Sequence, residues 1–132
     1  RNTFIEKNAI LVVEPHCPGQ TACLKIGSNC YINQFSFIDC HYSITICDSC
    51  LIGPYVYICD FDHVLGKNEF ICAPTVIESN TWIGAHACIL KGVTIGHHSI
   101  IAAGAVVTDS IPPFSIAAGV PARVVKKIQS ND

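Results

Sequence analysis

Residues 82–107 read WIGAHACILKGVTIGHHSIIAAGAVV and carry an aliphatic side chain at every sixth position, from Ile83 to Val107. A helix would repeat about every 3.6 residues and an alternating strand about every two, so neither fits this period. A period of six is the signature of a hexapeptide β-helix, in which each hexad supplies one short strand and a turn.

The same period runs through two tracts of the chain. The aliphatic positions are Ile26, Ile32, Ile38, Ile46, Ile52 and Ile58, and then Ile77, Ile83, Ile89, Ile95, Ile101 and Val107. A small or slim residue recurs four places later, at Cys30, Ser36, Cys50, Val56, Ala87, Val93, Ser99 and Ala105. We expect the aliphatic side chains to fill the core and three hexads, about 18 residues, to close one triangular coil. The pattern predicts one all-β domain, a parallel β-helix over about 24–110 with a tail at 111–132, and leaves room for an irregular coil before Leu24.

The period is interrupted at two places. Ile38 and Ile46 are eight positions apart, so two residues bulge near 41–44. Ile58 and Ile77 are nineteen apart, one more than three hexads, which could hide a degenerate coil. The polar sequence within this gap does not fit the hexad pattern, so we expect residues 59–75 to form a loop expelled from the solenoid. Loops on a rigid scaffold often carry function.

Composition favours a small protein that binds copies of itself. The chain has 132 residues, half of them hydrophobic and 14% charged, so a monomer would leave much apolar surface in water. A net charge of −2 argues against a nucleic-acid binder, and no apolar run reaches the length of a membrane span. There is neither a signal peptide nor a methionine, so we expect a trimmed chain or one domain of a longer protein.

The nine cysteines form no recognisable disulfide framework. Their number is odd, and Cys47 and Cys50 form the only C-x-x-C, whereas a zinc site of this kind needs a second pair. We therefore expect reduced, mostly buried thiols in a cytoplasmic protein, with no metal site.

Beyond the hexads, three motifs resemble a known family. IPPF at 111–114 and AGVPAR at 118–123 resemble the end of the left-handed β-helix acyltransferases. YICDFDH at 57–63 resembles the histidine loop of the sugar O-acetyltransferases, which include galactoside, maltose and polysaccharide-decorating enzymes. The resemblance extends from Leu24 to Lys126. It implies a left-handed, trimeric β-helix that moves an acetyl group from acetyl-CoA to a sugar hydroxyl.

His63 is the candidate general base. Acyl transfer from a thioester to a hydroxyl needs a base of near-neutral pKa, which histidine supplies without much tuning. Asp60 or Asp62 could orient the imidazole and stabilise its cation, as the carboxylate of a triad does. A histidine in a polar loop is often only a solvated side chain, but the break in the repeat and the motif favour catalysis.

The resemblance also implies donor and acceptor contacts. Six residues would contact acetyl-CoA: Ala85, Ala103, Gly104 and Thr108 along its groove, and Arg123 and Lys126 at its phosphates. Many relatives have a lysine where this chain has Asp109. Asn33 and Asp39 would bind sugar hydroxyls, although both residue types also serve ordinary turns.

Three other functions stay open. On the same scaffold, relatives acetylate the amino group of a nucleotide-linked amino sugar. Other β-helices are zinc carbonic anhydrases with three histidines, but the gaps between His41, His63 and His86 are wide for such ligands. A non-catalytic structural subunit would have no use for His63 or for the basic C-terminus.

Overall fold

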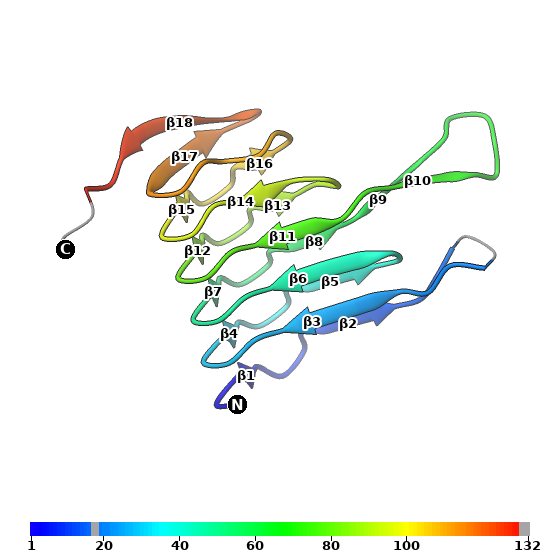
Figure 1. The fold of residues 1–132 in the computed structure, drawn as a ribbon, viewed down its shortest axis with the longest axis horizontal. Helices are drawn as coiled ribbons and strands as arrows, with labels where there is room; N and C mark the ends of the chain where they lie inside the picture. Colours follow the sequence, from blue (N-terminus) through cyan, green and yellow to red (C-terminus); the bar gives the residue numbers. More distant parts are fainter. Residues whose placement is uncertain (17–18, 130–132) are drawn as a thin grey trace.

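Short strands and no helix build the chain over residues 1–16 and 19–129, the part that the computed structural model describes. Three sheets run along the molecule (Figure 1). Sheet A contains β1 (Phe4–Ile5), β4 (Tyr31–Ile32), β7 (Leu51–Ile52), β12 (Trp82–Ile83), β15 (Ile100–Ile101), β17 (Ser115–Gly119) and β18 (Ala122–Lys127). Sheet B contains β2 (Ile10–Val13), β5 (Phe37–Cys40), β8 (Tyr57–Cys59), β13 (Cys88–Ile89) and β16 (Val106–Val107). Sheet C contains β3 (Cys23–Ile26), β6 (Ser43–Ile46), β11 (Thr75–Ile77) and β14 (Thr94–Ile95).

The chain visits sheets A, B and C in turn and so winds into a parallel β-helix. β1, β2 and β3 form the first coil, and β15 and β16 belong to the last, which closes where Ile111 bridges Ile95. The coil stack therefore begins at Phe4, well before Leu24. Neighbouring strands pair in parallel and in register from coil to coil.

The hexad aliphatics form the core. In sheet A, Ile32, Ile52, Ile83 and Ile101 lie directly above one another and are at most 1% exposed. Each such buried side chain contributes about 1.5–3 kcal/mol relative to an exposed one. Ile26 alone among the twelve is only half-buried, because β3 is the end strand of sheet C. The inward role predicted for the hexad aliphatics is confirmed.

Tight turns allow the coils to stack closely. Several corner residues adopt left-handed backbone conformations, among them Asn80 with a φ of 57° and Gly104 with a φ of 73°. Gly84 is needed for another reason, since a Cβ there would lie 2.7 Å from the Ala103 nitrogen of the next coil. Asparagine and glycine suit these turns because they tolerate conformations that crowd a larger side chain.

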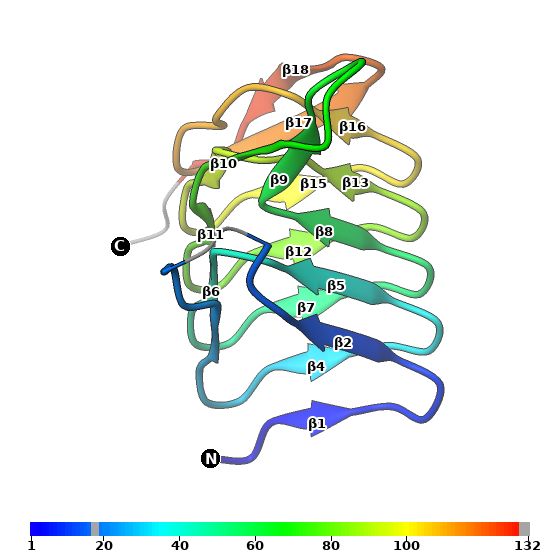
Figure 2. The same cartoon turned by 90° about the vertical axis from the view of Figure 1, so that its right-hand side faces the viewer.

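The residues that do not fit the six-residue repeat lie at the corner between sheets B and C. This corner contains residues 14–16 and 19–22 in the first coil, the bulge at His41 in the second coil and a hairpin in the third coil. The hairpin pairs β9 (Phe61–His63) with β10 (Phe70–Cys72) in antiparallel fashion, while Cys59 and Thr75 remain in strands of the coil. Figures 1 and 2 show the hairpin, in green, extending from this corner.

Two antiparallel strands close the C-terminal end. β17 pairs in parallel with β15, and β18 then folds back antiparallel along β17. No helix in residues 1–16 or 19–129 has the length and apolar character needed to cross a membrane. Within the same residues no disulfide joins the cysteines.

Candidate active site

His63 stands exposed on the hairpin. It is the last residue of β9 and lies opposite Phe70 across the antiparallel pair. Its ring lies 4.9 Å from the Phe70 ring and 5.7 Å from the Phe61 ring, between centroids. In the part of the chain that the structure describes, the imidazole makes no hydrogen bond, so both its nitrogens can meet a substrate.

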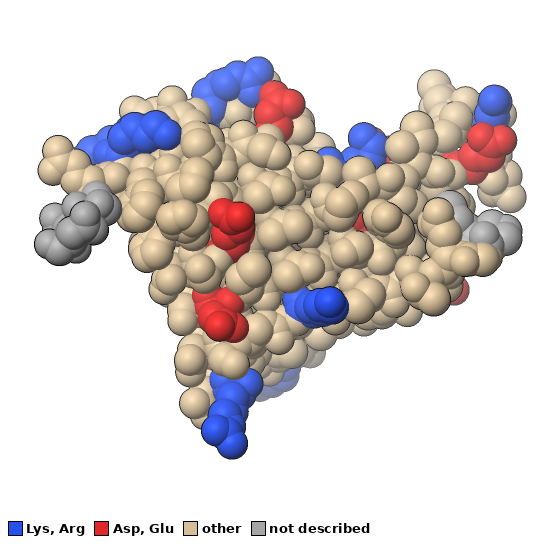
Figure 3. Space-filling view, in the orientation of Figure 1, with Lys and Arg blue, Asp and Glu red and all other residues tan. Residues whose placement is uncertain are grey.

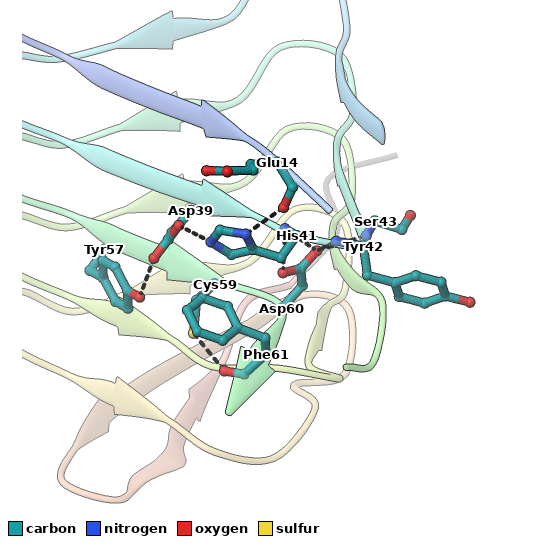
Figure 4. Close-up of polar contacts among 9 residues, drawn as sticks. All are labelled: Glu14, Asp39, His41, Tyr42, Ser43, Tyr57, Cys59, Asp60 and Phe61. Atoms are coloured by element: carbon teal, nitrogen blue, oxygen red, sulfur yellow. Dashed lines mark hydrogen bonds and ion pairs between the residues drawn. The ribbon is translucent and has the colours of Figure 1, made fainter. Parts of the chain in front are cut away.

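Asp60 is fully buried and faces the coil below. Its carboxylate accepts hydrogen bonds from the backbone N–H groups of His41 (2.9 Å), Tyr42 (2.8 Å) and Ser43 (2.7 Å), as Figure 4 shows. Asp60 was predicted to lie beside His63, but in the structure its carboxylate oxygens bind the backbone of the bulge in the second coil.

Asp62 points toward the fourth coil. Its Oδ2 lies 3.2 Å from the Lys91 ammonium, and both side chains are partly exposed. Among the described residues neither Asp60 nor Asp62 is hydrogen-bonded to the His63 ring. The three residues expected to act together therefore share one corner without forming a triad.

Asp39 lies near the same corner with its side chain 13% exposed and both of its oxygens engaged. Its Oδ1 lies 2.5 Å from His41 Nε2, and its Oδ2 accepts a 2.9 Å hydrogen bond from the Tyr57 hydroxyl (Figure 4). Burial raises the pKa of Tyr57, and the nearby Asp39 carboxylate adds to this, so the phenol stays protonated and donates. His41 itself is 5% exposed, and its Nδ1 lies 2.5 Å from the Glu14 carbonyl oxygen. The sequence offered one hint of this network, the two-residue bulge at His41.

Asn33 lies elsewhere, in an apolar groove on the outer face of sheet A. The groove has a volume of about 540 Å³, and Ala85 and Ala103 line it beside Asn33. Trp82 and Leu51, which are 53% and 49% exposed, also line it. Neither residue was predicted to line the site, although a large apolar residue at an outward hexad position was a usable signal.

The groove leads toward the C-terminal lysines. A second cavity of about 500 Å³ shares Ile100 with the groove and is lined by Lys126 and Lys127. Figure 3 shows Lys and Arg side chains, in blue, gathered at the β18 end of the molecule.

The remaining predicted donor contacts lie on other parts of the surface. Thr108 is exposed at the corner between sheets B and C, two coils above the hairpin. Arg123 lies nearby, 3.6 Å from Asp109 Oδ2. Gly104 is exposed in the turn directly after Ala103, at the corner between sheets A and B. The six predicted donor residues thus form two groups, one along sheet A and one at the hairpin corner.

No group of three His, Cys, Asp or Glu side chains within residues 1–16 and 19–129 is placed to hold a metal ion. His97 and His98 are in polar contact, with 2.9 Å between their Nδ1 atoms. Such a contact fits a hydrogen bond between a protonated and an unprotonated ring nitrogen.

Comparison with known proteins identifies relatives of this architecture. The family described as bacterial transferase hexapeptide (six repeats) matches residues 74–109. Galactoside O-acetyltransferase of Escherichia coli K12 is 44% identical over 114 residues, which are 83% of this chain and 56% of the relative. The chain therefore spans little more than half the length of that relative.

Solved structures extend the likeness to almost the whole chain. A galactoside acetyltransferase in complex with coenzyme A superposes with a TM-score of 0.85 and 36% identity, over 97% of this chain and 63% of that one. A hexapeptide-repeat-containing acetyltransferase from Vibrio cholerae, complexed with acetyl coenzyme A, gives 0.78 and 32%, over 98% of this chain and 72% of that one. These neighbours imply that the coils described above wind left-handed.

Proposed function

The chain belongs to the hexapeptide-repeat acetyltransferase family, and from this premise we propose that it transfers an acetyl group from acetyl-CoA to a sugar hydroxyl. The observation that carries the proposal is His63, whose imidazole is exposed on the hairpin and free of hydrogen bonds to the described residues. Relatives crystallised with coenzyme A and acetyl coenzyme A support the choice of donor.

The reaction needs one base and one conjugate acid, and His63 supplies both. The imidazole removes the proton of the acceptor hydroxyl while that oxygen attacks the thioester carbonyl carbon. When the tetrahedral adduct collapses, the carbon–sulfur bond breaks and the imidazolium returns the proton to the departing thiolate. The products are an acetyl ester and a free thiol, so protons and electrons balance.

The donor site requires two subunits, and we propose a homotrimer. The groove with Ala85 and Ala103 lies on sheet A, whereas His63 and Thr108 belong to the corner between sheets B and C, where Arg123 of β18 contacts Asp109. Figure 1 shows the hairpin on the side of the coil stack opposite the strands of sheet A. One donor molecule can meet both groups only between neighbouring protomers. The exposed apolar side chains along the groove would then be covered by the neighbour.

The residues fit the parts of acetyl-CoA. Small side chains in the groove leave room for the pantetheine arm, and Lys126 at its end offers a charge to the phosphates of the nucleotide. Arg123 contacts Asp109 of the fifth coil, which lies about 10 Å above the hairpin's coil, since neighbouring coils are about 4.8 Å apart. An extended pantetheine arm with its pyrophosphate spans a distance of that order.

For the acceptor, Asn33 remains the candidate sugar contact, because it lines the groove. Both oxygens of the Asp39 carboxylate are engaged by His41 and Tyr57, so we do not propose Asp39 as a direct sugar contact. Asp62, ion-paired with Lys91, would hold the hairpin toward the fourth coil.

The direct test is thiol release from acetyl-CoA in the presence of a panel of sugars, amino sugars and nucleotide sugars. Turnover with a sugar that lacks an amino group supports the proposal. Turnover only with amino sugars would make the chain an N-acetyltransferase, and no turnover with any acceptor would refute acetyl transfer. Light scattering tests the assembly, because a stable monomer at micromolar concentration contradicts the trimer.

A further inference from the structure

Five aromatic and histidine rings connect the hairpin to the coil stack. This ring cluster consists of His16, His41, Phe61, His63 and Phe70, which come from all three insertions at the corner between sheets B and C. His16 is sandwiched, with its centroid 3.6 Å from His41 and 4.2 Å from Phe70, and it is nearly parallel to both. Phe70 in turn packs against His63. A continuous path of ring contacts therefore runs from buried His41 to exposed His63.

His41 is the fixed end of this path. Its Nδ1 faces the Glu14 carbonyl oxygen and its Nε2 faces the Asp39 carboxylate. Both ring nitrogens are therefore engaged, each with an oxygen of another residue. The two contacts fix the plane of the His41 ring between Glu14 and Asp39.

Tyr57 and the backbone complete the support. The Tyr57 hydroxyl donates to the second oxygen of Asp39, and the His41 backbone N–H donates to Asp60. Consequently neither the ring nor the backbone of His41 can shift without breaking a buried hydrogen bond. Phe61, perpendicular to His41 at 4.4 Å, packs the first strand of the hairpin against this support.

We propose that Asp39 and His41 are positioning residues for His63. They act through the ring cluster by holding the hairpin at one angle to the coils, and they touch neither donor nor acceptor. The inference rests on the proposed function in taking His63 as the base. The physical reason is that a base must lie within about 3 Å of the proton that it removes, and a displacement of about 1 Å can cost about 100-fold in rate.

Asp39→Asn is the informative variant, because it preserves the shape of the side chain and removes the charge opposite His41. We expect kcat for thiol release to fall about 10- to 100-fold, with the KM values of acetyl-CoA and acceptor within about twofold of the native protein. Tyr57→Phe, which leaves the carboxylate in place, should give a smaller loss of the same kind. Glu69→Gln is the matched control, since it removes an exposed charge from the same hairpin without touching the ring cluster.

A second readout does not depend on activity. The ring-proton NMR resonances of His63 should move in Asp39→Asn, because the ring changes its place over Phe70, and should stay in Glu69→Gln. Unchanged kcat together with unchanged His63 resonances would overturn the proposal. A higher KM for the acceptor at constant kcat would overturn it too, since Asp39 would then bind the sugar directly.

The two proposals fail in different ways. If the native protein acetylates no acceptor, the proposed function is wrong, and the His63 resonances still decide whether Asp39 positions that ring. If the native protein is active and His63→Ala is not, an unaffected Asp39→Asn variant refutes only the positioning role.

Discussion

Asp60 and Ser43 belong to successive coils, and the Asp60 carboxylate accepts a 2.7 Å hydrogen bond from the Ser43 backbone N–H. Because the same carboxylate also binds the N–H groups of His41 and Tyr42, one buried charge satisfies three donors of the bulge. The Asp60 carbonyl oxygen accepts a hydrogen bond from the Ala73 N–H at the other end of the hairpin. Asp60 therefore ties the second coil to the base of the hairpin.

Asp60→Ala should destabilise the fold. The substitution leaves buried N–H groups without an acceptor, and each costs about 1–3 kcal/mol, so we expect a loss of about 3 kcal/mol or more. Urea unfolding followed by circular dichroism measures it. Asp62→Asn is the control, because its exposed ion pair is worth about 1 kcal/mol at most. Equal stability of the two variants would contradict the structural role of Asp60.

His63→Ala should abolish most of the activity while the fold remains. Loss of a general acid–base group lowers turnover by roughly 10²–10⁴-fold. The exposed ring contributes little to the core, so the circular dichroism spectrum should match that of the native protein. Thiol-release assays at saturating substrate give the change in kcat, and near-native turnover would exclude His63 as the base.

Arg123→Glu should weaken donor binding selectively. A negative side chain at this position repels the phosphates of coenzyme A, so the KM for acetyl-CoA should rise strongly while that for the acceptor changes little. Asp109→Asn should act in the opposite direction, since it releases Arg123 from its ion pair. If Arg123→Glu changed only the acceptor KM, the donor would not lie at this corner.

The buried thiols predict how stability depends on alkaline pH. Burial raises the pKa of Cys50 from 9.0 to about 12. Burial, together with the Asp60 charge, raises the pKa of Cys40 to about 11. A raised pKa in the folded state means that the unfolded thiol loses its proton first, so stability is complete below pH 9 and declines between about pH 9 and 12.

Unfolding free energies measured across that pH range test this, with Cys50→Ala as the comparison. The variant should lose part of the alkaline slope, in addition to any constant loss from the smaller side chain. An identical slope in the two proteins would show that the Cys50 thiol does not contribute.

The coil architecture could be predicted from the sequence because its signal is local. Whether Ile83 or Ile89 points inward depends only on its place within its own hexad, and in-register stacking then buries both. The same rule predicted an interruption at 59–75, and within this range β9 and β10 pair as an antiparallel hairpin. The motifs predicted one donor groove lined by Ala85, Ala103, Gly104 and Thr108, and the groove on sheet A is lined by the first two of these four.

The hydrogen-bond and ion-pair partners of the polar residues could not be predicted from the repeat. Asp39, Asp60 and Asp62 all occur near the breaks in the period, and nothing in their spacing distinguishes a carboxylate that faces His63 from one that binds another coil. The difference arises because residues 14–16 and 19–22, residues 41–42 and residues 60–74 are stacked at one corner by the winding of three coils. Contacts such as Asp60 to Ser43 or His41 to Glu14 join residues 17 and 27 positions apart, and only the stacking of coils brings their atoms within hydrogen-bonding distance.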